Sequence, residues 1–396
     1  MKENYEKTIK ACFIGYIVQA IINNFLPLLF VRIQSSYSIP LSQITVLVTF
    51  NFGIQLCVDL LSVKVIDKIG YRISMIVAHV FSALGLVLLT ILPELLTNAF
   101  YGFLIAVTVY AIGGGILEVL LSPVVEACPS ENKEKSMSML HSFYCWGHVS
   151  VVLISTLFFR FIGTNHWKFM TFLWAIVPLI NIFSFFKVPM ISLAEEEKSL
   201  KVKDLLQNKL FWLFFIMMVC SGASEQAVSQ WASTFAERGL GVTKVIGDLA
   251  GPMMFAALMG IARTFYGKYG EKISLDHFMI GSSVLCIISY MGISLLEYPV
   301  FNLMACGLCG LSVGIMWPGT FSKSASVLIR GGTPMFSLLA LGGDLGCSLG
   351  PTLVGFVSGI QGENLKVGIL VSVIFPLLLL IGTITSKGRR IRPVDK

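Results

Sequence analysis

A single carboxylate, Glu118, stands in the middle of an apolar run that extends from Tyr101 to Val125. A charged side chain near the centre of a bilayer costs roughly 3 kcal/mol on insertion scales, so an acid in such a place indicates a functional site. The chemistry open to it is proton exchange or polar contact with a solute. Glu118 is therefore the first candidate for a functional residue.

Amide side chains occur in two other apolar stretches. Gln19 and Asn23 are four residues apart and share one face of a helix, where they either bond a neighbouring helix or bind a ligand. Asn51, Gln55 and Asp59 have the same spacing and predict a polar stripe along a water-filled path. Asp59 is nearest to the following loop, and we interpret it as a gating contact.

Two later stretches combine polar and aromatic side chains. One contains His141 and Tyr144; the histidine is either bonded to a neighbouring helix or part of a binding site. The other has an acid, two amides and an indole, which suits a polyol whose C–H faces pack on the ring, and also suits other polar solutes. Its residues are Glu225, Gln226, Gln230 and Trp231.

Further candidates lie in or near turns and kinks. The segment Asp67-Lys-Ile-Gly-Tyr-Arg72 predicts a tight turn at its glycine, with charges that pair across helix ends. We expect Asp67, Arg72 and the intramembrane acid Asp344 to act in gating rather than in binding. Trp317 precedes a proline that predicts a kinked helix beside a cavity, which makes Trp317 a binding candidate.

The composition excludes an ordinary soluble protein. Hydrophobic residues make up 55% of the 396 residues and charged residues only 13%, where about a quarter would be usual. We expect a multi-pass protein of the cytoplasmic (inner) membrane, with the lipid bilayer as its surroundings. The net charge of +7 follows from loops on one side of the membrane and does not indicate a nucleic acid partner.

Twelve apolar stretches are long enough to span a bilayer, which takes about 20 residues per helix. All should be helical, because hydrocarbon offers no water to unpaired backbone groups. They are residues 11–33, 41–63, 73–96, 100–126, 136–161, 169–187, 209–236, 243–266, 275–296, 299–322, 334–360 and 367–386.

The distribution of Lys and Arg predicts the orientation. Only six of the 29 lie on the side opposite the N-terminus, so the positive-inside rule places both termini in the cytoplasm. The longest connection, residues 188–208, predicts a cytoplasmic linker between a six-helix bundle at 1–187 and a second at 209–396, which ends in a short basic tail. Matching loop motifs at Asp67-Lys-Ile-Gly70 and Gly267-Lys-Tyr-Gly270 indicate that the halves are repeats.

Motifs for catalysis or tightly bound groups do not occur in the sequence. There is no GxSxG, no HExxH and no phosphate-binding loop, so we expect neither an enzyme nor a cofactor. The nine cysteines are dispersed along apolar stretches, and the pair Cys306 and Cys309 has no second pair beside it, so no metal site is expected.

Twelve helices in two repeats, with the Asp67-to-Arg72 loop, resemble the major facilitator superfamily over essentially the whole chain. Leu117-Glu118-x-x-x-Ser122-Pro123 is similar to a motif of its fucose permease and glucose/galactose:proton symporter group, in which the glutamate is linked to proton coupling. His141-Ser-Phe143-Tyr144 resembles a stretch whose polar residues face the sugar in that group. The segments around Glu225, Trp231 and Trp317 are similar as well.

The resemblance implies import of a monosaccharide or related polar solute with protons, by alternating access. We expect the protein to be a monomer. That group has an aspartate four residues before a proline where this chain has Asn23 before Pro27, so either Glu118 couples alone or coupling is absent. Sodium is an alternative coupling ion. A proton-driven exporter of drugs or metabolites is the alternative function, and a non-transporting receptor is disfavoured because no soluble domain is present.

Overall fold

The computed structural model describes residues 5–129, 133–190, 202–270, 273–328 and 332–388. Every regular element in these ranges is a helix, and within them twelve continuous or broken helices are long and apolar enough to cross a membrane. The predicted all-α class and the twelve spans are therefore confirmed, with ends that differ from the sequence estimates by several residues.

Seven spans are essentially continuous helices, as expected where no water can pair with the backbone. They are α3 (Leu41–Ile69), α4 (Tyr71–Leu95), α5 (Ala99–Ala127), α6 (Lys133–Ile162), α7 (Trp167–Lys187), α13 (Leu275–Leu295) and α16 (Gly332–Ile360). Gly70 alone separates α3 from α4, at φ 87° and ψ 149°. Because side chains other than hydrogen are strained there, the predicted turn does depend on its glycine.

Five spans are broken. They are α1, η1 and α2 (Tyr5–Asn24, Leu26–Leu29, Phe30–Tyr37); α9, α10 and η3 (Lys209–Ser229, Ala232–Thr234, Phe235–Gly239); α11, η4 and α12 (Lys244–Asp248, Leu249–Met253, Met254–Tyr269); α14 and α15 (Pro299–Val313, Met316–Val327); and α17 and α18 (Leu365–Val371, Ile374–Ser386). Pro27, Pro252, Pro318 and Pro376 lie at four of the breaks, where the missing N–H cannot continue the helix. By contrast, α5 continues through Pro123.

Two short helices lie outside the spans. The 3-10 helix η2 (Thr164–His166) precedes α7, and α8 (Val202–Leu206) lies in the predicted linker, of which residues 191–201 are outside the described ranges. The chain forms two compact units. The first is Met1–Leu193 with Gln230–Ala257, and the second is Ala194–Ser229 with Leu258–Lys396.

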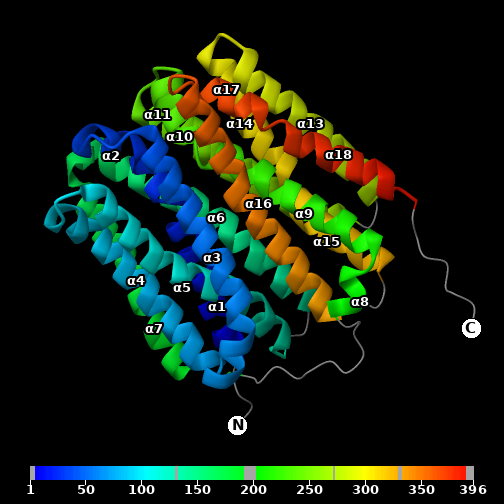
Figure 1. Ribbon diagram of the computed structural model, residues 1–396. Coiled ribbons are helices and arrows are strands. Elements are labelled where there is room, and N and C mark those ends of the chain that lie inside the picture. Colours follow the sequence, from blue (N-terminus) through cyan, green and yellow to red (C-terminus); the bar gives the residue numbers. More distant parts are fainter. Residues whose placement is uncertain (1–4, 130–132, 191–201, 271–272, 329–331, 389–396) are drawn as a thin grey trace, which may run out of the picture. The chain divides into compact units, whose positions relative to one another are not determined.

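In the first unit, α4 lies along α5 and α7, while α1 packs against α5, α6 and α7 (Figure 1). α11 and η4 pack on α6, although they follow the linker in sequence. Large buried aromatic side chains fill the interior of this unit, among them Phe25, Phe30, Phe103 and Tyr110. α1 is buried on most of its surface, which places its amides inside the bundle.

In the second unit, α9 packs along α16 and also contacts α14, α15 and α18, and α13 lies beside α14 and α18 (Figure 1). Glycines bring α9 and α16 together. A Cβ atom at Gly346 would lie 2.0 Å from the Val219 carbonyl oxygen, and one at Gly350 would lie 2.4 Å from that of Ala223. Small residues at such an interface let two backbones approach closely.

Candidate functional site

Three helices of the first unit meet around Glu118. Gln19 on α1 donates from Nε2 to Oε2 of Glu118 on α5, at 2.9 Å, and to Oε1 of Gln55 on α3, also at 2.9 Å. Both protons of this amide are thereby used. The four-residue spacing on α1 and α3 produces this meeting, since it keeps the polar groups of each helix on one face.

The hydrogen bonds continue from Gln55 to Asn23. Oδ1 of Asn23 accepts from Gln55 Nε2 at 2.9 Å and from Asn51 Nδ2 at 3.2 Å. The Asn23 backbone oxygen accepts from Gln230 Nε2 at 3.0 Å. We call Gln19, Asn23, Asn51, Gln55 and Gln230 the amide cluster; all five are at least 95% buried. It joins the carboxylate on α5 to α1, to α3 and to the turn at Gln230 through an unbroken set of bonds.

Two acceptors of the amide cluster have no donor. Gln19 Oε1 and Asn51 Oδ1 are buried and find no hydrogen-bond partner among the described residues. Asn51 also lines a cavity of about 10 Å³ together with Asn23, Gln230, Tyr110 and Pro27, which is about the space of one water-sized group. A buried acceptor is costly without a partner, so a hydroxyl or water donor would stabilise this position.

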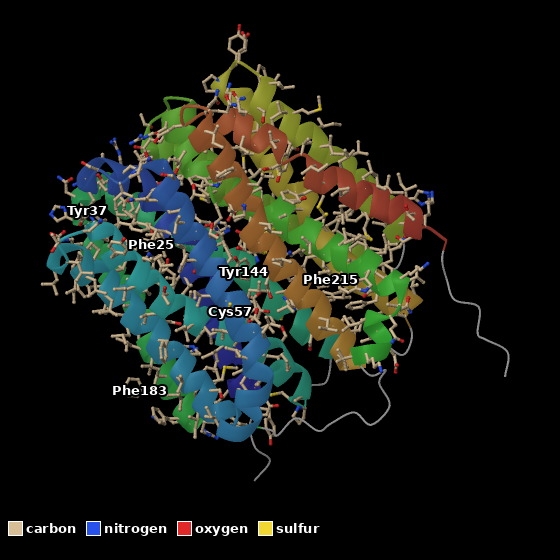
Figure 2. The ribbon with its side chains drawn as sticks, in the orientation of Figure 1. Phe25, Tyr37, Cys57, Tyr144, Phe183 and Phe215 are labelled. Atoms are coloured by element: carbon tan, nitrogen blue, oxygen red, sulfur yellow. The ribbon has the colours of Figure 1, made fainter. Side chains whose placement is uncertain are left out.

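Aromatic residues flank α1 on the side of α6. The Tyr16 hydroxyl bonds Ser122 Oγ at 3.0 Å, and its ring lies edge-on to His141 and Tyr144, with centroids 5.5 and 6.3 Å apart. Asn24 Nδ2 donates to the Tyr144 hydroxyl at 3.4 Å (Tyr144 is labelled in Figure 2). Four sequence candidates, Glu118, Asn23, His141 and Tyr144, therefore lie around α1 in one unit.

The candidate residues of the seventh span belong to two different compact units. Gln230 and Trp231 follow the end of α9 and belong to the first unit, where Trp231 is fully buried with its ring 5.5 Å from that of Phe30. Glu225 and Gln226 lie on α9 in the second unit. Gln226 and Gln230 do not share one continuous helix, because α9 ends at Ser229.

Glu225 is part of an ion pair inside the second unit. Arg263 Nη2 on α12 lies 3.3 Å from Glu225 Oε2, and Gln226 Nε2 donates to Oε1 at 3.2 Å. Arg263 Nε also donates to the Gly314 oxygen, at the break between α14 and α15. Sequence reasoning missed Arg263 because, although it lies within the predicted span 243–266, it was counted among the cytoplasmic basic residues.

Trp317 lies on α15 and Asp344 lies on α16, and these two helices contact each other. The half-buried indole covers Gly343, where a Cβ atom would lie 2.2 Å from the ring. Asp344, the next residue, is 6% exposed. The glycine thus creates the space that Trp317 occupies.

The three gating candidates of the first unit differ in what they contact. Arg72 donates from Nη1 to the oxygens of Phe185 and Phe186, at 2.8 and 3.0 Å, and so binds the negative end of the α7 dipole. Asp59 is 8% exposed on α3, one turn beyond Gln55. The side chain of Asp67 lies outside the part of the structure that is described.

A buried acid that sequence reasoning missed is Asp248, at the end of α11. Its carboxylate accepts from Ser233 Oγ at 2.5 Å and Thr156 Oγ1 at 3.1 Å and lies 3.0 Å from Lys244 Nζ. Lys244 also donates to the Leu28 oxygen at 2.6 Å. These bonds connect α6, α10, α11 and η1. The available signal was the position of this acid inside the predicted span 243–266.

The family model described as Major Facilitator Superfamily matches residues 11–351, most of the chain. The chain belongs to this superfamily. It is accordingly a multi-pass membrane transporter and not an enzyme, as the motifs indicated. A search of curated proteins finds no significant match.

Solved structures with the same fold include three transporters. The Escherichia coli fucose:proton symporter FucP aligns over 97% of this chain and 100% of its own, with a TM-score of 0.67 and 15% identity. A D-xylose-proton symporter aligns over 99% and 100%, with a TM-score of 0.76 and 12% identity. A bacterial homolog of the human lysosomal transporter Spinster aligns over 100% of both chains, with a TM-score of 0.74 and 12% identity.

At these identities the likeness establishes the superfamily fold alone. Two of the three descriptions name different sugars and the third names no solute, so the fold does not by itself select a solute. The choice of solute and coupling ion has to be argued from the residues of this chain.

Proposed function

We propose that the protein imports a monosaccharide or a related small, hydroxyl-rich solute together with protons across the cytoplasmic membrane, by alternating access. The observation that carries this proposal is the bond from Glu118 through Gln19 to the amide cluster. It connects the one acid of α5's apolar centre directly to neutral hydrogen-bonding groups of the kind that bind hydroxyls.

The amide cluster fits a neutral, hydroxyl-bearing solute. Amides both donate and accept, and the two buried acceptors, Gln19 Oε1 and Asn51 Oδ1, are suited to hydroxyl donors. Tyr16, His141 and Tyr144 add a ring surface for the C–H faces of a sugar. The fucose and xylose symporters, which share the fold, support this class of solute.

The hydrogen bond of Gln19 also suggests how a proton could be coupled to binding. An ionised Glu118 accepts from Gln19 Nε2, whereas a protonated Glu118 has a hydroxyl that needs an acceptor. Gln19 would then present Oε1 instead, and its bond to Gln55 would be released. Protonation of one carboxylate would thus rearrange the groups that hold the solute.

The test is uptake of labelled monosaccharides by proteoliposomes, with and without an inward pH gradient. We expect gradient-driven accumulation of one sugar by the wild type. Glu118→Gln should lose accumulation but keep exchange of sugar for sugar, because a neutral amide cannot release a proton. Glu297→Gln, at an exposed acid in a loop, is the matched control and should behave as the wild type.

Full accumulation by Glu118→Gln would refute coupling through this residue. If no sugar enters under any gradient, sugar import is wrong, and proton-driven export of drugs or metabolites becomes the function to test. Drug susceptibility of a deletion strain would then show whether cells depend on such export.

A further inference from the structure

A pocket lies at the end of the first unit that is farthest from the N-terminus of α1. Its volume is about 460 Å³, within the range of small-molecule sites. The end of α2, the end of α4, η2 and the start of α7 surround it. Figure 2 shows Tyr37, which lines the pocket, at one end of this unit and Phe183 near the other.

Basic residues are scarce on this side of the chain. The six are Arg32, Arg160, Lys168, Arg238, Lys244 and Lys366. Two of them, Arg32 and Lys168, nevertheless line the same pocket. The positive-inside rule disfavours Lys and Arg on this side of the membrane. The presence of both Arg32 and Lys168 in one pocket therefore indicates a role for their charges at that place.

Lys168 already has an anionic partner. Its Nζ lies 2.6 Å from Oε1 of Glu94, and the Tyr37 hydroxyl donates to the same oxygen at 2.6 Å. These two bonds compensate the one carboxylate in the pocket wall and fix its position. The charges of Lys168 and Glu94 thereby balance each other. The positive charge of Arg32 is then the uncompensated charge of the pocket lining.

Arg32 is half-buried and has no such partner. Its Nε is buried and finds no acceptor among the described residues. The cost of burying a charged donor without an acceptor is large, so a guanidinium in this place is suited to an anion from outside the chain. Its planar fork matches the oxygens of phosphate.

The start of α7 adds positive potential at the same place. Trp167 and Lys168 form its first turn and line the pocket, and no side chain caps this end. The Trp167 N–H already donates to the Thr164 oxygen of η2, so the contribution of this helix end is the positive end of the α7 dipole, which favours an anion. The pocket therefore combines a guanidinium whose Nε has no acceptor among the described residues, the positive end of a helix and a volume sufficient for a phosphate group.

We propose that this pocket binds a singly charged phosphate group, held by Arg32 and favoured by the positive end of α7. The group is either the headgroup of an anionic phospholipid or free phosphate, and the two sources share the same chemistry. Binding here is independent of the sugar transport proposed above, since none of its residues belongs to the amide cluster.

The test is thermal unfolding of the purified, full-length protein in detergent. One arm adds short-chain phosphatidylglycerol, a second adds inorganic phosphate, and a third adds short-chain phosphatidylcholine as a lipid without net charge. We expect one of the first two to raise the midpoint of the wild type. Phosphatidylglycerol alone would identify a lipid headgroup, and inorganic phosphate would identify a free anion.

Two variants and one control locate the site. Arg32→Gln should weaken the apparent affinity at least about tenfold, the effect of losing hydrogen bonds to a charged group. Asn165→Asp places a carboxylate in the pocket wall at an exposed position, where misfolding is not expected, and should weaken affinity as well. Arg160→Gln, at an exposed arginine of α6, should leave affinity unchanged.

The proposal is wrong if neither phosphatidylglycerol nor phosphate stabilises the wild type, or if phosphatidylcholine does so equally. It is also wrong if both Arg32→Gln and Asn165→Asp retain wild-type affinity. Should Arg32→Gln fail to fold, Asn165→Asp alone decides, because its position is exposed.

Discussion

At the scale of single residues, Gln19 is the contact on which the proposed coupling depends. Its Nε2 is shared between Glu118 and Gln55, so its orientation is determined by two acceptors at once. Removal of this amide would separate the carboxylate from the rest of the amide cluster without any change of charge. The role of Gln19 can therefore be tested apart from that of Glu118.

We predict that sugar exchange by Gln19→Leu loses most of its pH dependence and shows a weaker apparent affinity for the sugar, because Oε1 is removed together with Nε2. The substitution leaves buried acceptors on Glu118 and Gln55 without their donor, which costs about 1–3 kcal/mol of stability. Sugar counterflow measured over a range of external pH, together with thermal unfolding, would check these effects. Gln361→Leu, at an exposed position in a loop, should change neither. A wild-type pH profile in Gln19→Leu would contradict the proposed relay.

At the scale of elements, the second unit depends on close approach of α9 and α16. Glycines at this interface leave no space for a methyl group, and Gly222 on α9 faces the Gly343 oxygen in the same way, with a Cβ position 2.2 Å from it. The structure shows close packing in the state that it describes.

Gly346→Ala should destabilise the protein by about 1–3 kcal/mol, because the methyl group forces the two backbones apart. Gly359 lies on the same helix and has no atom within 4 Å of an added Cβ. Gly359→Ala is therefore the matched control, and its higher helix propensity should leave stability equal or slightly increased. Unfolding midpoints of the two variants in detergent would compare them directly. Equal midpoints would contradict the prediction, because they would show that α9 and α16 can move apart without loss of stability.

At the scale of the whole molecule, the compact units do not follow the two halves of the sequence. Residues 230–257 come after the linker, yet they belong to the first unit. The bonds from Gln230 to Asn23, from Lys244 to Leu28 and from Thr156 to Asp248 account for this grouping. The boundary between the two sequence repeats is therefore not the boundary between the two compact units.

The orientation in the membrane is a prediction for the molecule as a whole. Gln361→Cys, between α16 and α17, should react with a membrane-impermeant maleimide in intact cells. Lys203→Cys, in α8 of the linker, should react only after lysis, because the excess of Lys and Arg places the linker in the cytoplasm. The wild type, with its exposed Cys57, measures the background. The reverse pattern would invert the predicted topology.

The sequence by itself determined the membrane class, the twelve spans and the superfamily. Hydrocarbon permits few backbone conformations, so a long apolar run directly predicts a membrane-spanning helix. It also identified Glu118 and the amides of α1 and α3, since polar groups on an apolar helix are conspicuous. Only the tertiary structure decided which of them meet. The ion pairs of Arg263 with Glu225 and of Asp248 with Lys244 became visible only in the structure. The sequence does not contain these distances, because they depend on helix packing and on breaks such as the one after Ser229.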